Sequence, residues 1–196
     1  AVVIVHPNNP TGHFTAAQER DALERICRQH GLVLIVDEVF LDYAIEQDRS
    51  PAARSSFASG VHPVLTYVLS GLSKVAGLPQ MKAAWIAAFG PASLLQEATA
   101  RLEVIADTFL SMNAPVQYAL PYLVGKRQNI QKQILSRVRE NLTTLDRRLQ
   151  DTPAVSRLDV QGGWYVVLRV PALMSGENLA IRLLEEQRVI VHPGYF

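Results

Sequence analysis

Two short runs of purely apolar residues, at positions 1–5 and 32–36, constrain the fold of this chain more than any other feature. A strand buried on both faces reads as a continuous apolar run, and a helix between two such strands is typical of parallel pairing. Residues 15–18 resemble a capping box at the start of that helix, and His30-Gly31 is expected to end it. The sequence therefore predicts a strand–helix–strand unit in a parallel sheet.

Two further apolar runs, 64–69 and 83–89, are expected to join the same sheet. Helical periodicity begins at residue 91, with a second helix at about 115–124 and a long one at 128–150. Short strands at about 155–158, 163–170 and 189–191, with a helix at about 177–187, predict a small α+β domain. We thus expect an α/β chain with a larger domain at 1–128 and a smaller C-terminal domain at 129–196, entered through the long helix.

Composition narrows the class of function. The 196 residues include 19 basic and 18 acidic ones, for a net charge of +1, so no basic surface for nucleic acid or a membrane is expected. The single cysteine excludes an intrachain disulfide and favours a reducing compartment, which we interpret as the cytoplasm. The five histidines show no metal-ligand spacing, so we expect no metal site. Small-molecule chemistry is the favoured class.

The segment 70–82 places Lys74 on a Ser/Gly-rich loop directly after an apolar run. A lysine ammonium is costly to bury, so a lysine in this position usually has a partner or has formed an imine. Burial favours the neutral amine, which can attack a carbonyl carbon. The alternative is a solvated loop lysine, which is the usual state of a lysine taken alone.

Two polar residues upstream also follow predicted strands. Asn9 lies in the turn after the first strand, and Asp37 ends the second, at the carboxyl edge where open parallel sheets bind ligands. A carboxylate at the end of a buried strand needs a cation or a hydrogen-bond donor. Taken separately, Asn9 is consistent with an ordinary Asn-Pro turn and Asp37 with a helix or turn cap.

Together, the segments around Asn9, Asp37 and Lys74 resemble fold-type I, pyridoxal-phosphate-dependent aminotransferases of class I/II. The resemblance implies pyridoxal 5′-phosphate as cofactor, an amino acid and a 2-oxo acid as substrates, and a homodimer. It implies that Asn9 donates a hydrogen bond to the phenolic oxygen of the cofactor and that Asp37 pairs with its pyridinium nitrogen. Lys74 would hold the cofactor as an imine and then move a proton between the substrate α-carbon and the cofactor.

The chain departs from the family pattern near the phenolic oxygen. Three residues after Asp37, where the family commonly has a tyrosine that donates to this oxygen, the chain has Phe40. Tyr43, three residues further on, is the candidate replacement. Glu38 is interpreted as structural. The Gly-Gly-aromatic segment ending at Trp164 resembles the family strand that helps to close over the substrate, although a plain hairpin explains it almost as well.

It also departs near the cofactor phosphate. Gly71 stands where the family often has a phosphate-binding serine, and Ser70 and Ser73 on either side of it are the candidates to replace that hydroxyl. Lys82 stands where the family usually has an arginine, so the charge is kept but the planar fork of donors is lost. We assign Ser70, Ser73 and Lys82 to the phosphate.

The sequence covers only about half of a family member, and it lacks the segments that complete the cofactor and substrate sites. For these 196 residues alone we expect weak cofactor binding and little or no turnover. Two alternatives stay open: a lyase or decarboxylase of the same fold, which would use the same three residues, and a non-catalytic aminotransferase-like sensor domain.

Overall fold

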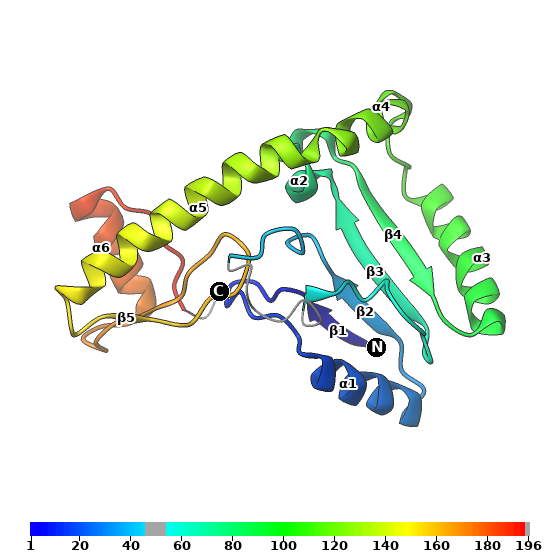
Figure 1. The fold of residues 1–196 in the computed structure, drawn as a ribbon, viewed down its shortest axis with the longest axis horizontal. Helices are drawn as coiled ribbons and strands as arrows, with labels where there is room; N and C mark the ends of the chain where they lie inside the picture. The colour runs from blue at the N-terminus through cyan, green and yellow to red at the C-terminus, as the bar shows by residue number, and fades with distance from the viewer. Residues whose placement is uncertain (46–53, 195–196) are drawn as a thin grey trace.

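The computed structural model describes residues 1–45 and 54–194 and is built on a four-stranded sheet in the order β1-β2-β3-β4. The strands are β1 (Val2–Val5), β2 (Leu34–Asp37), β3 (Thr66–Gly71) and β4 (Ala84–Phe89). The expectation that all four apolar runs share one sheet is confirmed. Figure 1 shows β1 at one side of the sheet and β4 at the other.

The pairing directions differ along the sheet. β1 pairs with β2, and β2 with β3, in parallel, whereas β4 runs antiparallel to β3. A parallel pair needs a crossover connection, and helix α1 (Ala17–Gln29) supplies one between β1 and β2. The connection from β3 to β4 holds only α2 (Leu72–Val75) and a single 3₁₀ turn, Pro79–Met81, so the chain returns beside the strand that it has just left.

Helix α1 packs against the sheet through Cys27, its one buried residue. Cys27 of α1 is fully buried against Leu34, Val36 and Val68 in the main core cluster, so it is a packed core thiol. The helix begins one residue later than the predicted capping box requires. Ala16 is its N-cap, and the Glu19 carboxylate accepts a hydrogen bond from the Ala16 N–H at 2.7 Å, so Thr15 does not cap the helix.

Three helices follow the sheet in sequence, α3 (Ala92–Thr108), α4 (Ala114–Gly125) and α5 (Arg127–Gln150). A second core cluster joins α2 to α4 through Leu72, Ala76, Ala83 and Val116. Helix α5 then runs from α4, beside α2, to the C-terminal elements at its other end (Figure 1). The predicted long helix is thus confirmed, and it connects the two ends of the structure.

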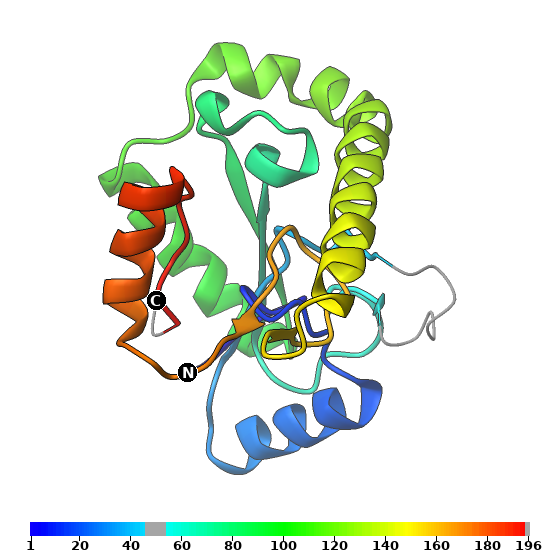
Figure 2. The same cartoon turned by 90° about the vertical axis from the view of Figure 1, so that its left-hand side faces the viewer.

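The C-terminal region contains a two-stranded antiparallel sheet of β5 (Ser156–Arg157) and β6 (Leu168–Arg169), and helix α6 (Gly176–Gln187). Figure 2 shows α6 on the opposite side of the molecule from α5. The predicted strand at 189–191 is wrong, because those residues pair with no other strand among the described residues. The division at residue 128 stays a prediction, and residues 195 and 196 of the smaller domain lie outside the described part of the chain. No helix in 1–45 or 54–194 is long and apolar enough to cross a membrane.

Candidate functional site

The strand register brings the predicted site segments to one edge of the sheet. Val5 at the end of β1 is aligned with Asp37 at the end of β2, and Asp37 is aligned with Leu69 near the end of β3. The three parallel strands therefore deliver the Asn9 turn, Asp37 and the Lys74 loop to the same carboxyl edge. Open α/β sheets bind ligands at this edge.

Asn9 and Asp37 differ in their surroundings. The Asn9 turn is closed by hydrogen bonds from Asn8 N to His13 O and from Gly12 N to Asn8 O, at 2.8 and 2.7 Å, and it leaves Asn9 exposed. Asp37 is half-buried, and its Oδ1 accepts a hydrogen bond from the Val39 N–H at 3.0 Å. The turn-capping alternative thus describes one oxygen of Asp37, and Oδ2 has no hydrogen-bond partner among the described residues.

Lys74 lies in the short helix α2, and the side chain of Tyr43 fixes its backbone by a hydrogen bond. The Tyr43 hydroxyl donates a hydrogen bond to the Lys74 carbonyl oxygen at 2.6 Å, and Tyr43 is fully buried. Burial raises the pKa of Tyr43 to about 12, so the hydroxyl keeps its proton over the physiological range. A cofactor contact of Tyr43 stays a prediction. The one hydrogen-bond donor of its side chain is already used by the Lys74 carbonyl oxygen.

The Nζ of Lys74 lies against two aromatic rings that pack on each other. Its Nζ is 5.1 Å from the ring centre of Trp164 and 5.5 Å from that of Phe40, and the two rings meet edge to face at 5.2 Å. Within 1–45 and 54–194, no carboxylate lies within ion-pairing distance of Nζ. Aromatic faces attract a cation, so the two rings hold the Lys74 side chain in place without an ion pair.

Trp164 reaches the lysine because its segment is fastened to both upstream loops. Gly162 N donates to Gly12 O at 2.9 Å, Gly163 N donates to Tyr43 O at 2.9 Å, and Ala44 pairs with Gly162 in an isolated bridge. A Cβ on Gly162 would lie 2.7 Å from the Phe14 ring, so this close approach requires glycine. The Gly-Gly pair therefore serves to dock the segment onto the sheet edge.

The phosphate candidates lie around α2. Ser70 and Ser73 are half-buried and flank Gly71, while Lys82 is exposed and has φ of 50°. A Cβ on Gly71 would lie 2.8 Å from Ala83 O, which explains why the serine that the family often has here is absent. Whether these three side chains bind a phosphate stays a prediction.

Two buried ionisable residues support the frame of the site. The Glu38 carboxylate accepts hydrogen bonds from Ser56 Oγ and Phe57 N, each at 2.6 Å, and burial raises the pKa of Glu38. His6 is buried against the rings of Phe14 and Phe57, and burial lowers its pKa to about 4. Glu38 is thus structural, as the sequence predicts.

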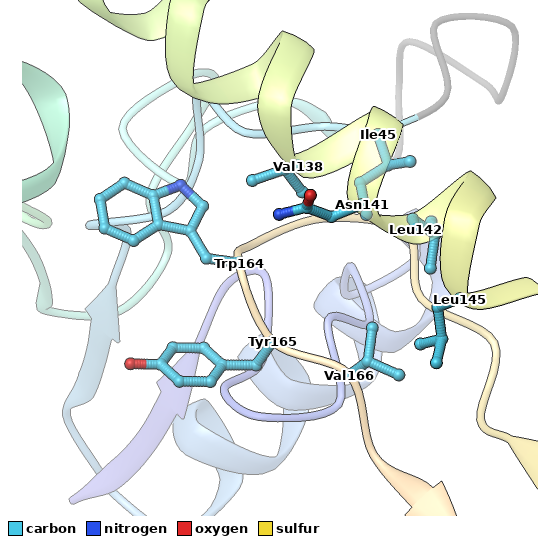
Figure 3. Close-up of a pocket in the computed structure, with 8 residues that line it drawn as sticks. All are labelled: Ile45, Val138, Asn141, Leu142, Leu145, Trp164, Tyr165 and Val166. Carbon is cyan, nitrogen blue, oxygen red and sulfur yellow. The ribbon is translucent and has the colours of Figure 1, made fainter. Parts of the chain in front are cut away.

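An apolar pocket lies between the Trp164 segment and α5. Its lining comprises Ile45, Val138, Asn141, Leu142, Leu145, Trp164, Tyr165 and Val166. Figure 3 shows the Trp164 and Tyr165 rings extending to the same side of their loop, away from Leu142 and Leu145 of α5. None of the predicted site residues lines this pocket, so it is separate from the Lys74 site and shares with it only Trp164.

Sequence reasoning missed two contacts at the site. One is the contact of the Trp164 ring with Lys74 Nζ, and the other is the hydrogen bond from the Tyr43 hydroxyl to the Lys74 carbonyl oxygen. The Gly-Gly-aromatic pattern was the one local signal for the first, and it is equally typical of a hairpin. Nothing in the sequence indicates the second, because the partner is a backbone carbonyl 31 residues away.

Comparison with known proteins agrees with this geometry. The family model described as aminotransferase class I and II matches residues 1–196. An alanine aminotransferase of Mycobacterium tuberculosis is 28% identical over 99% of this chain and 46% of its own length. The glutamate-pyruvate aminotransferase AlaA of Escherichia coli is 27% identical over 98% of this chain and 48% of its own length. The chain thus spans about half the length of the curated relatives that it matches.

Solved structures share the fold. A tyrosine aminotransferase from Leishmania infantum matches 98% of this chain and 48% of its own, with a TM-score of 0.81 and 20% identity. An alanine aminotransferase from Pyrococcus furiosus matches 96% of this chain and 47% of its own, with a TM-score of 0.78 and 21% identity. Pyridoxal 5′-phosphate, the cofactor predicted from the sequence, is the cofactor of this family. The chain therefore belongs to the class I and II aminotransferase family.

Proposed function

We propose that this protein is a pyridoxal-phosphate-dependent aminotransferase that moves an amino group from an amino acid to a 2-oxo acid, with Lys74 as its catalytic residue. The observation that carries the proposal is the strand register, which aligns Val5, Asp37 and Leu69 and so gathers the three family segments at one sheet edge. The family match over the whole chain supports it.

The residues present fit the cofactor. An aldehyde needs an amine without a permanent ion pair, and Lys74 Nζ lies against the Phe40 and Trp164 rings with no carboxylate among the described residues in ion-pairing distance. A pyridinium nitrogen needs a carboxylate oxygen, and Oδ2 of Asp37 has no partner among the described residues, while Oδ1 is fixed by Val39 N. The buried indole N–H of Trp164 finds no acceptor in the described chain, which leaves a donor for a bound group.

Each residue then has a role in the reaction. When bound, pyridoxal phosphate supplies an aldehyde for amine exchange and a ring that accepts electrons from the substrate α-carbon. In the proposal Asp37 keeps the pyridine nitrogen protonated, and Asn9 orients the ring by a hydrogen bond to its phenolic oxygen. Lys74 Nζ would remove the proton from the substrate α-carbon and return it to the cofactor carbon that carried the aldehyde, which is linked to the α-carbon through the substrate nitrogen.

Three further side chains would hold the phosphate. Ser70 and Ser73 each offer a hydroxyl donor, and Lys82 offers a positive charge that does not reproduce the paired donors of an arginine. Tyr43 acts through the lysine in this proposal, because its hydroxyl proton goes to the Lys74 carbonyl oxygen at 2.6 Å.

The proposal includes a homodimer and a cytoplasmic location. Several large apolar side chains on and beside α3 and α4 are exposed, namely Val104, Phe109, Leu110, Tyr118 and Tyr122. An exposed apolar surface of this kind is typical of a face that another polypeptide surface covers. Equilibrium sedimentation at several concentrations tests the dimer.

The test of the function is covalent trapping. The purified chain is mixed with pyridoxal phosphate, reduced with borohydride and digested, and the modified lysine is found by mass spectrometry. We expect modification at Lys74, and none there in Lys74→Ala. Lys126 is the matched control, because its Nζ also lies 5.5 Å from an aromatic ring centre, that of Tyr122.

A second step separates transamination from other reactions on the same site. Because little or no turnover is expected of these 196 residues alone, the test reads a single half-reaction: addition of an amino acid to the loaded chain should slowly yield pyridoxamine phosphate and the 2-oxo acid in equal amounts. Release of carbon dioxide instead would indicate a decarboxylase. Random labelling of exposed lysines, with Lys74 no more reactive than Lys126, would refute the proposal.

A further inference from the structure

We propose that the indole N–H of Trp164 is the hydrogen-bond donor that replaces the tyrosine hydroxyl missing at Phe40, and that it donates to the phenolic oxygen of pyridoxal phosphate. The inference rests on the proposed function. It assigns to the Gly-Gly-aromatic segment a role in binding the cofactor, in addition to closing over the substrate.

Among the described side chains packed around Lys74, Trp164 offers a buried donor without a partner. The side chain of Phe40 has no polar atom. The Tyr43 hydroxyl already donates its hydrogen bond to the Lys74 carbonyl oxygen. Trp164 packs edge to face against both of these rings, with centres 5.2 and 5.0 Å away. Tyr165 also packs against Phe40, but it is 44% exposed, whereas the N–H of Trp164 is buried.

That donor is buried and has no acceptor among the described residues. Buried indole N–H groups usually find a hydrogen-bond partner, and each exception calls for an explanation. The ring of Trp164 lies 5.1 Å from Lys74 Nζ, the atom that would bond to the aldehyde carbon of the cofactor. In pyridoxal phosphate the phenolic oxygen is on the ring atom next to the one that carries the aldehyde, so a cofactor bound to Lys74 would bring an acceptor close to the Trp164 ring.

The backbone holds Trp164 in place for such a contact. The two residues before it are bound to Gly12 O and to Tyr43 O, each through an N–H at 2.9 Å. Gly12 belongs to the turn that carries Asn9, and Tyr43 is hydrogen-bonded to the Lys74 backbone. The donor is therefore fixed relative to both of the other groups that the proposed site uses.

The experiment compares variants that separate the ring from its N–H. Trp164→Phe keeps an aromatic ring and loses the donor, whereas Trp164→His keeps a ring N–H. Phe40→Tyr, made in the wild type and in Trp164→Phe, restores a hydroxyl donor at the family position. Tyr165→Phe is the matched control, because it removes a hydroxyl from the neighbouring ring, which also packs against Phe40. Circular dichroism establishes that each variant is folded.

Two quantities are measured: the dissociation constant of pyridoxal phosphate, and the pH at which the absorption band of the bound cofactor titrates. Removing a donor to a charged oxygen is expected to weaken binding about tenfold and to raise the titration pH by about one unit. Trp164→Phe should show both changes. Trp164→His and the double variant with Phe40→Tyr should recover most of the loss, and the control should match the wild type within about twofold.

The outcomes distinguish the inference from the function. If the wild type is trapped at Lys74 but Trp164→Phe binds and titrates like it, the inference is overturned and the function stands. The same holds if Phe40→Tyr has equal effects with and without Trp164, because the two donors would then not substitute for each other. If the wild type forms no adduct at Lys74, the proposed function and this inference are both overturned.

Discussion

Acidification is expected to destabilise this protein through His6, because the native structure holds that imidazole neutral. His6 is 1% exposed, and its Nδ1 accepts a hydrogen bond from the Thr15 N–H at 3.1 Å. A ring nitrogen that accepts a hydrogen bond has no proton, so protonating it would break the contact. Burial lowers the pKa of His6 from the ordinary value of 6.5 to about 4.

The sign and size follow from proton linkage. Between pH 6.5 and 4 the unfolded chain binds a proton at His6 that the native state does not bind, so stability falls as the pH falls. Above this window both states are neutral and the effect vanishes. The full gap corresponds to about 3 kcal/mol, of which about 2 kcal/mol is lost between pH 7 and pH 5.

The assay is urea unfolding followed by circular dichroism at several pH values between 7.5 and 4.5, for the wild type and for His6→Gln. Glutamine does not titrate, and its amide oxygen can accept the same hydrogen bond. Both proteins contain Glu38 and the other carboxylates, so the difference between their curves isolates His6. We expect the wild type to lose about 2 kcal/mol more than the variant between pH 7 and pH 5. Parallel curves would refute the reasoning.

Three substitutions test individual contacts by urea unfolding. Gly71→Ser restores the serine that the family often has, and it should cost about 1–3 kcal/mol because its Cβ would lie 2.8 Å from Ala83 O; an unchanged midpoint would contradict this. Tyr43→Phe removes the hydrogen bond to the Lys74 carbonyl and should cost about 1–2 kcal/mol, and a more stable variant would show that the contact contributes nothing. The Glu38 carboxylate accepts a hydrogen bond from the buried Phe57 N–H at 2.6 Å, and Glu38→Ala would leave this N–H without an acceptor. The variant should lose about 2 kcal/mol of stability, and a loss below about 0.5 kcal/mol would argue against this role.

Local sequence signals predicted the first half of the fold well. The apolar runs at 1–5 and 32–36, with a Gly-ended helix between them, allow only a crossover unit, and the structure has β1, α1 and β2 there in parallel. The antiparallel direction of β4 could not be read in the same way, because a buried strand is apolar in either direction. The expected strand at 189–191 does not form, since a β-branched run needs a partner strand and this one has none among the described residues.

The candidate site also has a part that the sequence predicts and a part that it does not. Asp37 and Lys74 stand at the ends of strands, so their common position at the sheet edge follows from the parallel pairing alone. The contact between Lys74 and Trp164 joins residues 90 positions apart and depends on how the segment at 161–164 docks on Gly12 and Tyr43. No periodicity or spacing encodes such a contact, because it arises only when distant parts of the chain pack together.

The position of β1 at one end of the sheet has a consequence for handling the protein. Among the described residues β1 pairs only with β2, so every second N–H and C=O along Val2–Val5 is left for another strand. The edge strand β1 has no charged residue, no proline and no bulge, which are the usual protections against strand addition, and its Val3 is exposed. The chain is therefore expected to accept a complementary strand supplied in trans and, without one, to aggregate at high concentration by edge-to-edge pairing.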